Sequence, residues 1–170
     1  MKSNYAACLS FTLQFEGGYV NHPRDPGGET NKGVTKRVYD AYRAKKGKAP
    51  QSVRNISDAE LQEIYKRQYW DAVRGDELPA GIDACVFDLA VNSGPGRAVK
   101  QLQQALGVKV DGNLGMATIA AAQAMDAVKL VNALVNRRND FLKSLGTFPT
   151  FGKGWMRRTA ALRKTALGMV

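Results

Sequence analysis

The stretch AGIDACVFDLAVN, residues 80–92, decides the fold class of this chain. Its apolar residues recur on every side of the helix that their spacing predicts, and a helix that is apolar nearly all round is a buried one. We therefore predict a buried helix from Ala80 to about Asn92. Asp88 and Asn92 lie four positions apart in it and share a face. We expect Asp88 to be structural, paired with an arginine.

The segments on either side of this stretch are also helical in pattern. Helical spacing predicts further helices at about residues 4–16, 35–45, 57–70, 97–106, 117–124 and 126–145, and from Trp155 onward after a loop at 147–154. Thr35 and Asp126 are suited to cap their helices, and Ser57 with Glu60 forms a capping box. The turn-rich residues 17–32 allow a small β-hairpin. We expect one mainly α domain that spans residues 1–170.

The small number of histidines and cysteines limits the kinds of chemistry that we expect of this chain. One histidine, His22, and two cysteines, Cys8 and Cys85, form no cluster with metal-ligand spacing, so we expect no metal ion and no cofactor. Each cysteine lies in an apolar stretch, which predicts buried free thiols. With a single histidine, serine-hydrolase chemistry has little support. The first 15 residues lack the pattern of a secretory signal peptide, so we expect the protein to stay in the cytoplasm until it is released.

The formal net charge is +10, and from Arg137 onward eight basic residues stand against one acid, Asp140. Such a charge attracts polyanions, which include nucleic acid, anionic lipid and anionic cell-wall polymer. The chain lacks zinc-finger spacing, an aromatic-rich basic strand and a helix-turn-helix pattern. We therefore do not expect specific binding of nucleic acid.

Glu16 stands in the run FEGGY, residues 15–19, directly after an apolar stretch with helical spacing. Asp25 follows nine positions later and Thr30 five after that. A carboxylate at the end of a buried helix, followed by a Gly-rich loop with a second carboxylate, suits acid/base chemistry. The helix holds the first acid rigidly, and the loop leaves room for a substrate.

Several segments together resemble glycoside hydrolase family 108. They are EGGY (16–19), DPGGET (25–30), GVTK (33–36), YW (69–70), VNSGPGR (91–97), LGV (106–108) and DG (111–112). The run FGKGW (151–155) is similar to the peptidoglycan-associated region that follows the catalytic part in this family. The resemblance covers nearly the whole chain, and EGGY, DPGGET and VNSGPG are its most specific motifs.

This resemblance implies a lysozyme-like, mainly α fold and N-acetylmuramidase activity. The substrate would be peptidoglycan, cleaved at the β-1,4 bond between N-acetylmuramic acid and N-acetylglucosamine. Residues 1–90 would form the catalytic part and residues 91–170 a helical peptidoglycan-associated part. Family members commonly serve as phage or prophage endolysins, which implies bacteriolytic, antimicrobial action on periplasmic peptidoglycan. We expect the chain to act as a monomer.

The resemblance also implies site residues. Glu16, Asp25 and Thr30 are similar to the Glu/Asp/Thr arrangement of phage-type lysozymes, although the Asp-to-Thr interval is one residue shorter here. Glu29 or Thr35 could therefore take the place of Thr30, and both are expected among the substrate-binding residues. Asn92 and Ser93 lie in a segment that resembles the floor of the substrate cleft, although Asn92 could instead cap its helix. Tyr19 could stack on a sugar ring or could be a core tyrosine.

The chemistry of the residues agrees with this reading. Glycosidic cleavage needs a proton for the leaving oxygen and an activated water or a negative charge near the anomeric carbon. Glu16 would supply the proton, and Asp25 on its loop would hold the water, which favours inversion. Two alternatives remain: a lytic transglycosylase, in which the muramic C6 hydroxyl replaces water, and a non-catalytic wall-binding protein.

The basic C-terminal helix suggests a second surface. From Trp155 to Leu167, apolar residues fall near one side of the expected helix and basic residues cover much of the rest. Such a helix can lie on an anionic outer-envelope surface. Alternatively, the apolar side packs on the core and the charges simply face water.

Overall fold

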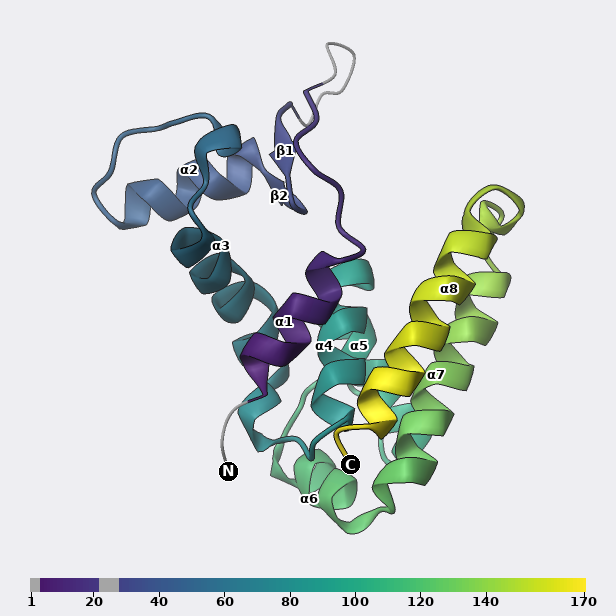
Figure 1. Cartoon of the computed structure of the whole chain (residues 1–170). Coiled ribbons are helices and arrows are strands. Elements are labelled where there is room, and N and C mark those ends of the chain that lie inside the picture. Colours follow the sequence, from purple (N-terminus) through teal and green to yellow (C-terminus); the bar gives the residue numbers. More distant parts are fainter. Residues whose placement is uncertain (1–3, 22–27) are drawn as a thin grey trace. The chain divides into compact units, whose positions relative to one another are not determined.

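The computed structural model describes residues 4–21 and 28–170 (Figure 1). Within these residues the chain is mainly helical with one small antiparallel hairpin, so the predicted fold class is confirmed. The helices are α1 (Tyr5–Leu13), α2 (Lys36–Lys45), α3 (Asp58–Tyr65), α4 (Ile82–Ser93), α5 (Pro95–Leu106), α6 (Met116–Ala124), α7 (Ala127–Lys143) and α8 (Phe148–Leu167). The strands are β1 (Thr30–Asn31) and β2 (Val34–Thr35), and the short helical turns are η1 (Val53–Asn55), η2 (Lys66–Trp70), η3 (Asp71–Val73) and η4 (Gly75–Glu77).

The chain forms two compact units. The smaller unit is residues 9–67, and the larger unit combines the residues up to Cys8 with residues 68–170. The boundary passes through α1, whose first four residues belong to the larger unit and whose last five belong to the smaller one. No single described helix is long and apolar enough to cross a membrane; α6 and α7 meet that criterion only as a pair bent by 115°.

Helix α4 forms the core of the larger unit. Every residue from Ile82 to Ala90 is buried, and α5, α7 and α8 pack around the helix (Figure 1). This confirms the buried helix that the sequence predicts. The helix begins after Gly81, which has a φ of +82° and lies so close to the Ala166 carbonyl that a Cβ would clash with it. Cys8 and Cys85 are buried free thiols, as expected.

One buried acid ties three helices together. Asp88 of α4 accepts hydrogen bonds from Arg138 of α7 at 2.6 Å and from Arg158 of α8 at 2.8 and 3.0 Å. Burial alone would raise the pKa of the Asp88 carboxyl, but the two guanidinium groups hold that pKa below its ordinary value. Asp88 is therefore structural, as predicted, and has two arginine partners rather than one.

Helix α8 begins earlier than expected. The sequence predicts a loop at 147–154 and a helix from Trp155, but the helix already starts at Phe148. Pro149 does not interrupt it, because proline fits the first turn, where its missing N–H is not needed. Gly152 is needed there because a Cβ would lie 2.6 Å from the Phe148 ring. Gly152 thus serves packing, and Gly154 lies within the same helix, where a Cβ would meet nothing within 4 Å.

The remaining boundaries differ by small amounts. Thr35 and Asp126 cap α2 and α7, and the Ser57–Glu60 capping box is present, so these predictions are confirmed. The helix expected at 57–70 is α3 continued by a five-residue π-helical turn, η2. Such a turn cannot be predicted from a 3.6-residue period, because its hydrogen bonds span five residues and shift the side chains out of that period. Of the five residues of η2, only Trp70 is buried.

Candidate active site

Glu16 lies three residues beyond the end of α1 and not within that helix as predicted. The helix ends at Leu13, and the amides of Phe15 and Glu16 bond back to Thr12 and Leu13 carbonyls at 3.1 and 3.3 Å. These three-residue steps tighten the chain into a turn, which leads directly into Gly17. Glu16 is half-buried, so its carboxylate is both supported by the fold and reachable.

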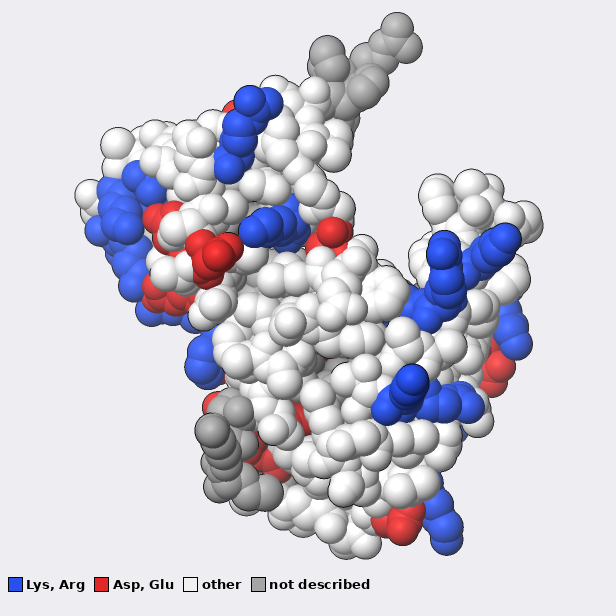
Figure 2. Space-filling model, in the orientation of Figure 1, with Lys and Arg blue, Asp and Glu red and all other residues white. Residues whose placement is uncertain are grey.

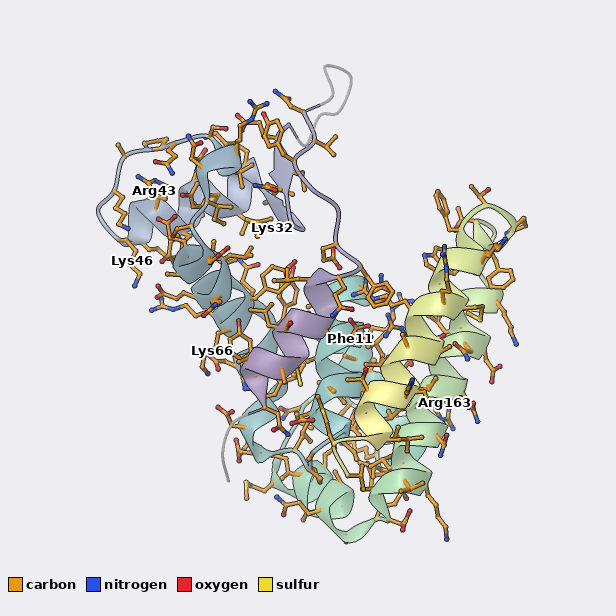
Figure 3. All side chains as sticks on the ribbon, in the orientation of Figure 1. Phe11, Lys32, Arg43, Lys46, Lys66 and Arg163 are labelled. Atoms are coloured by element: carbon orange, nitrogen blue, oxygen red, sulfur yellow. The ribbon has the colours of Figure 1, made fainter. Side chains whose placement is uncertain are left out.

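The hairpin turn approaches the Glu16 side chain. A Cβ on Gly33 would lie 3.0 Å from Glu16 Oε2 and even closer to the Tyr65 hydroxyl. The Tyr65 hydroxyl donates a hydrogen bond to the Lys32 carbonyl at 2.8 Å, which fixes the turn (Lys32 is labelled in Figure 3). The Glu16 carboxylate therefore packs against the backbone of this turn.

The geometry of the turn explains the glycine. Asn31 pairs with Val34, so Lys32 and Gly33 form a two-residue hairpin loop. Both have positive φ, +46° and +77°, as a type I′ turn requires. Lys32 is one of two described residues other than glycine with positive φ. The expected hairpin is thus confirmed, although its turn begins at the last residue of the segment 17–32 and its second strand, Val34–Thr35, lies beyond that segment.

Thr30 lies in the middle of this small sheet. It pairs with Thr35 on one side and, through two 2.8 Å hydrogen bonds, with Val20 on the other. Because directly opposed residues share a face, Thr30 and Thr35 project from one face and Asn31 and Val34 from the other. The second face is buried, and Asn31 donates to the Val53 carbonyl at 3.2 Å.

Thr35 and Glu29 already have partners within the fold. The Thr35 hydroxyl accepts the Val38 amide at 3.4 Å and so caps α2. The Glu29 carboxylate accepts a hydrogen bond from the Ser52 hydroxyl. These contacts give both residues a structural task, which weakens the case for either as a substitute for Thr30.

The other predicted site residues are spread over the chain. Tyr19 is half-buried, and the Arg54 guanidinium lies over its ring at 4.3 Å, so it is not a core tyrosine. Asn92 and Ser93 are the last two residues of α4, in the larger unit, and Asn92 is exposed. The C-terminal cap of this helix is Gly94, whose amide donates to the Ala90 carbonyl. Asp25 falls in residues 22–27, outside the described residues.

Glu60 is a buried carboxylate whose role the sequence revealed only in part. Besides its capping box, it accepts the Tyr39 hydroxyl at 2.7 Å and Arg43 at 3.1 Å (Arg43 is labelled in Figure 3). Burial alone would raise its pKa, but hydrogen bonds from Tyr39, Ser57 and Lys48 lower it to about 2. A carboxyl held ionised in this way cannot donate a proton at neutral pH, so Glu60 joins α2 to α3 and is not a catalytic acid.

Within the described residues no group of three or more His, Cys, Asp or Glu side chains could hold a metal ion.

The mainly helical fold, with a carboxylate set against a small hairpin, fits the lysozyme-like class of folds. The family described as glycosyl hydrolase 108 matches residues 9–94, about half of the chain, and the chain belongs to that family. A second family, described as "Predicted Peptidoglycan domain", matches residues 97–160.

Among solved structures, the chain is similar to one titled "Structure of Brucella abortus SagA". The two share 43% sequence identity and a TM-score of 0.82 over 98% of this chain and 95% of that one. No curated protein matches the chain. The family match confirms the resemblance inferred from the sequence, and the protein is a glycoside hydrolase that acts on peptidoglycan.

Proposed function

We propose that the protein is an N-acetylmuramidase that cleaves the β-1,4 bond between N-acetylmuramic acid and N-acetylglucosamine. The observation that carries this proposal is the half-buried Glu16 carboxylate packed against the Lys32–Gly33 turn. Rigid placement of a proton donor beside a glycine turn leaves little room for the acid to move. General acid catalysis depends on such placement within hydrogen-bond reach of the leaving oxygen.

In this proposal Glu16 protonates the glycosidic oxygen, and Asp25 holds the water that attacks the anomeric carbon. Thr30, in the centre of the small sheet, helps to position that water. Tyr19, Asn92 and Ser93 contribute to substrate binding. Attack by a water held across from the acid inverts the anomeric configuration, so the nascent reducing end is the α-anomer.

Digestion of purified peptidoglycan with Glu16→Gln tests the acid. We expect loss of at least about 10²–10⁴-fold in the release of muropeptides, because general acid catalysis contributes about that much. The helical circular dichroism should be unchanged. Glu77→Gln, at an exposed glutamate of the larger unit, is the matched control and should keep full activity. If Glu16→Gln retains more than about a tenth of the activity, Glu16 is not the proton donor.

The second carboxylate needs its own comparison. Asp25→Asn should reduce turnover strongly, whereas Glu29→Gln should mainly lose the contact with Ser52. The opposite result, an active Asp25→Asn and an inactive Glu29→Gln, would assign the role to Glu29. Mass analysis of the products separates hydrolysis from the lytic transglycosylase reaction, whose anhydro product is lighter by one water, about 18 Da.

We also propose that the protein is a phage or prophage endolysin, released from the host cytoplasm to act on periplasmic peptidoglycan as a monomer. Membership of a peptidoglycan hydrolase family supports this role. Expression in a Gram-negative host should cause lysis only when the inner membrane is permeabilised, for example by a co-expressed holin. Lysis without permeabilisation would contradict this route, and gel filtration at several concentrations tests the monomer.

A contribution of α8 to binding of the anionic outer envelope is a further part of the proposal. Figure 2 shows Lys and Arg side chains standing out along α8 on the face drawn. Three basic residues of this helix are exposed: Lys153, Arg157 and Lys164. Two other arginines of α8 have partners: Arg158 is buried on Asp88, and Arg163 donates to Asn136 (Arg163 is labelled in Figure 3).

A further inference from the structure

An open groove of about 670 Å³ lies in the larger unit, where α5 and α7 pack against each other. One wall is the loop that leads into α5, residues 93–96, and the others come from side chains of α5 and α7. Most of this groove lies within the segment that matches the peptidoglycan domain, residues 97–160. It is separate in sequence from Glu16, and nothing in the proposed catalytic reaction uses its side chains, apart from Ser93 at its edge.

Three cations converge on this groove: Arg97 and Lys100 from α5 and Arg137 from α7. Their side chains are exposed, and among the residues that the structure describes none of them is paired with a carboxylate. The Arg97 guanidinium lies over the Phe141 ring at 4.3 Å, which holds its position while leaving its N–H groups available. Asp140 also lines the groove, so its net charge is positive but not uniformly so.

The beginning of α5 adds uncharged donors to the same groove. This helix has 12 residues and starts after Gly94, which provides no side-chain cap. The amides of Gly96 and Arg97 therefore have no partner within the helix. Unpaired amides at a helix N-terminus favour a negatively charged group, because the helix dipole is positive at that end.

Gln101 points to a ligand in a different way. Its side chain lines the groove although the residue is only 7% exposed, and its Oε1 atom has no hydrogen-bond partner among the described residues. A buried acceptor without a donor costs free energy, so such atoms are rarely left unpaired unless something else completes them. An N–H or O–H group of a bound molecule would complete this acceptor.

From these features we propose that the groove binds the stem peptide of peptidoglycan, an inference that rests on the proposed function. The stem peptide carries carboxylates for Arg97, Arg137 and the α5 amides, and peptide N–H groups for Gln101. Its diamino acid carries an ammonium group that suits Asp140. A polyphosphate lacks that cation and would leave Asp140 without a partner. Binding the stem peptide would hold the glycan strand near the enzyme without contacting the bond that is cleaved.

Calorimetry with the full chain and a free stem tetrapeptide, L-Ala–D-Glu–diaminopimelate–D-Ala, tests this site directly. The peptide has no glycosidic bond, so binding is measured without turnover. We expect Arg97→Gln and Arg137→Gln each to weaken binding at least about tenfold, the loss typical of one charge-assisted hydrogen bond. Lys129→Gln, which removes one exposed charge from α7 outside the groove, is the matched control and should bind as the parent does.

The ligand is distinguished by two further probes under the same conditions. Glycan strands stripped of their peptides should bind without any effect of Arg137→Gln, and a short oligonucleotide should bind more weakly than the tetrapeptide. The inference is overturned if the tetrapeptide does not bind, if Arg97→Gln and Arg137→Gln bind it as the parent does, or if stripped glycan or the oligonucleotide depends on Arg137 instead.

This outcome can be told apart from a failure of the proposed function. Parent protein that releases muropeptides but does not bind the tetrapeptide keeps its muramidase assignment and loses this site. Parent protein that binds the tetrapeptide through Arg97 and Arg137 but releases no muropeptides keeps the site and loses the muramidase assignment.

Discussion

Gly33 occupies a position where any side chain would disturb the candidate acid. It has a positive φ, and a Cβ would meet Glu16 Oε2 and the Tyr65 hydroxyl. Gly47 also has a positive φ, +67°, but a Cβ there would meet nothing within 4 Å. The two glycines therefore separate backbone strain from steric displacement of the acid.

We predict that Gly47→Ala loses about 1–2 kcal/mol of stability, because an L-residue is strained in the left-handed region. Gly33→Ala should lose more, because its Cβ would also clash with the Tyr65 hydroxyl. Only Gly33→Ala should also lose muropeptide release, by roughly 10²-fold, since a shift of about 1 Å in a catalytic group can cost that much. Urea unfolding and muropeptide release measure the two effects. Equal activities of the two variants would show that the turn does not position Glu16.

Glu60 should give the protein a pH-dependent stability. Its folded pKa of about 2 lies below its ordinary value of 4.5, so the ionised form stabilises the fold. That contribution, about 3 kcal/mol, is complete above about pH 4.5 and disappears as the pH falls through about 2. We predict that the stability difference between the parent and Glu60→Gln, measured by urea unfolding, shrinks over this range. A difference that stays constant from pH 6 to pH 2.5 would contradict the assignment.

At the scale of the elements, Asp88 links α4 to α7 and α8 through two buried arginines. Removing its charge leaves those arginines buried without a counter-charge. We predict that Asp88→Asn costs about 3–5 kcal/mol, the loss typical of breaking a buried ion pair. Asp140→Asn, at an exposed acid of α7, is the control and should change stability by less than about 0.5 kcal/mol. Urea unfolding at neutral pH measures the stability of both variants. Similar losses of stability would show that the buried cluster of Asp88 with its two arginines does not stabilise the fold more than an exposed acid does.

The elements themselves were largely predictable. The periodicity of apolar residues located every helix from α2 to α7 within a few residues, because such helices bury one stripe or, for α4, nearly all sides. Two predicted helix boundaries were wrong: α1 ends before Glu16, and α8 begins before Trp155. Helix α1 ends in three-residue hydrogen bonds that lead into Gly17, and α8 begins early because Pro149 fits its first turn and Gly152 packs on Phe148.

At the scale of the whole molecule, not every basic residue counted in the formal net charge of +10 contributes to a basic surface. Arg138 and Arg158 are buried on Asp88, so they add little to the field outside the protein. An envelope-binding role of α8 must then depend on its exposed residues, Lys153, Arg157 and Lys164.

We predict that replacing these three residues with Gln weakens binding to whole envelopes or lipopolysaccharide and makes its salt dependence shallower. Each basic residue near an anionic membrane surface is worth about 1 kcal/mol. Cleavage of soluble wall fragments should be unchanged. The control replaces the exposed Arg37, Lys45 and Lys109 with Gln, which removes the same charge elsewhere. If both triple variants bind envelopes equally across a salt series, α8 has no specific role in binding.

The sequence by itself determined the fold class, the buried α4, the caps of α2, α3 and α7, and the family, because local spacing and short motifs encode them. It also singled out Glu16 as the candidate acid. It could not show which of the arginines would meet Asp88, since the partners lie 50 and 70 positions away along the chain.

Only the tertiary structure decided that Glu60 is held ionised, that Gly33 lies against Glu16, and that Gln101 faces a groove of cations. Each of these depends on how helices and the hairpin pack, which brings together residues that no periodicity relates. The sequence does not distinguish a charged residue that is solvated from one that is buried. Packing decides between the two, because it removes water from the side chain and places partners beside it, and these two effects determine the charge state and the role of the residue.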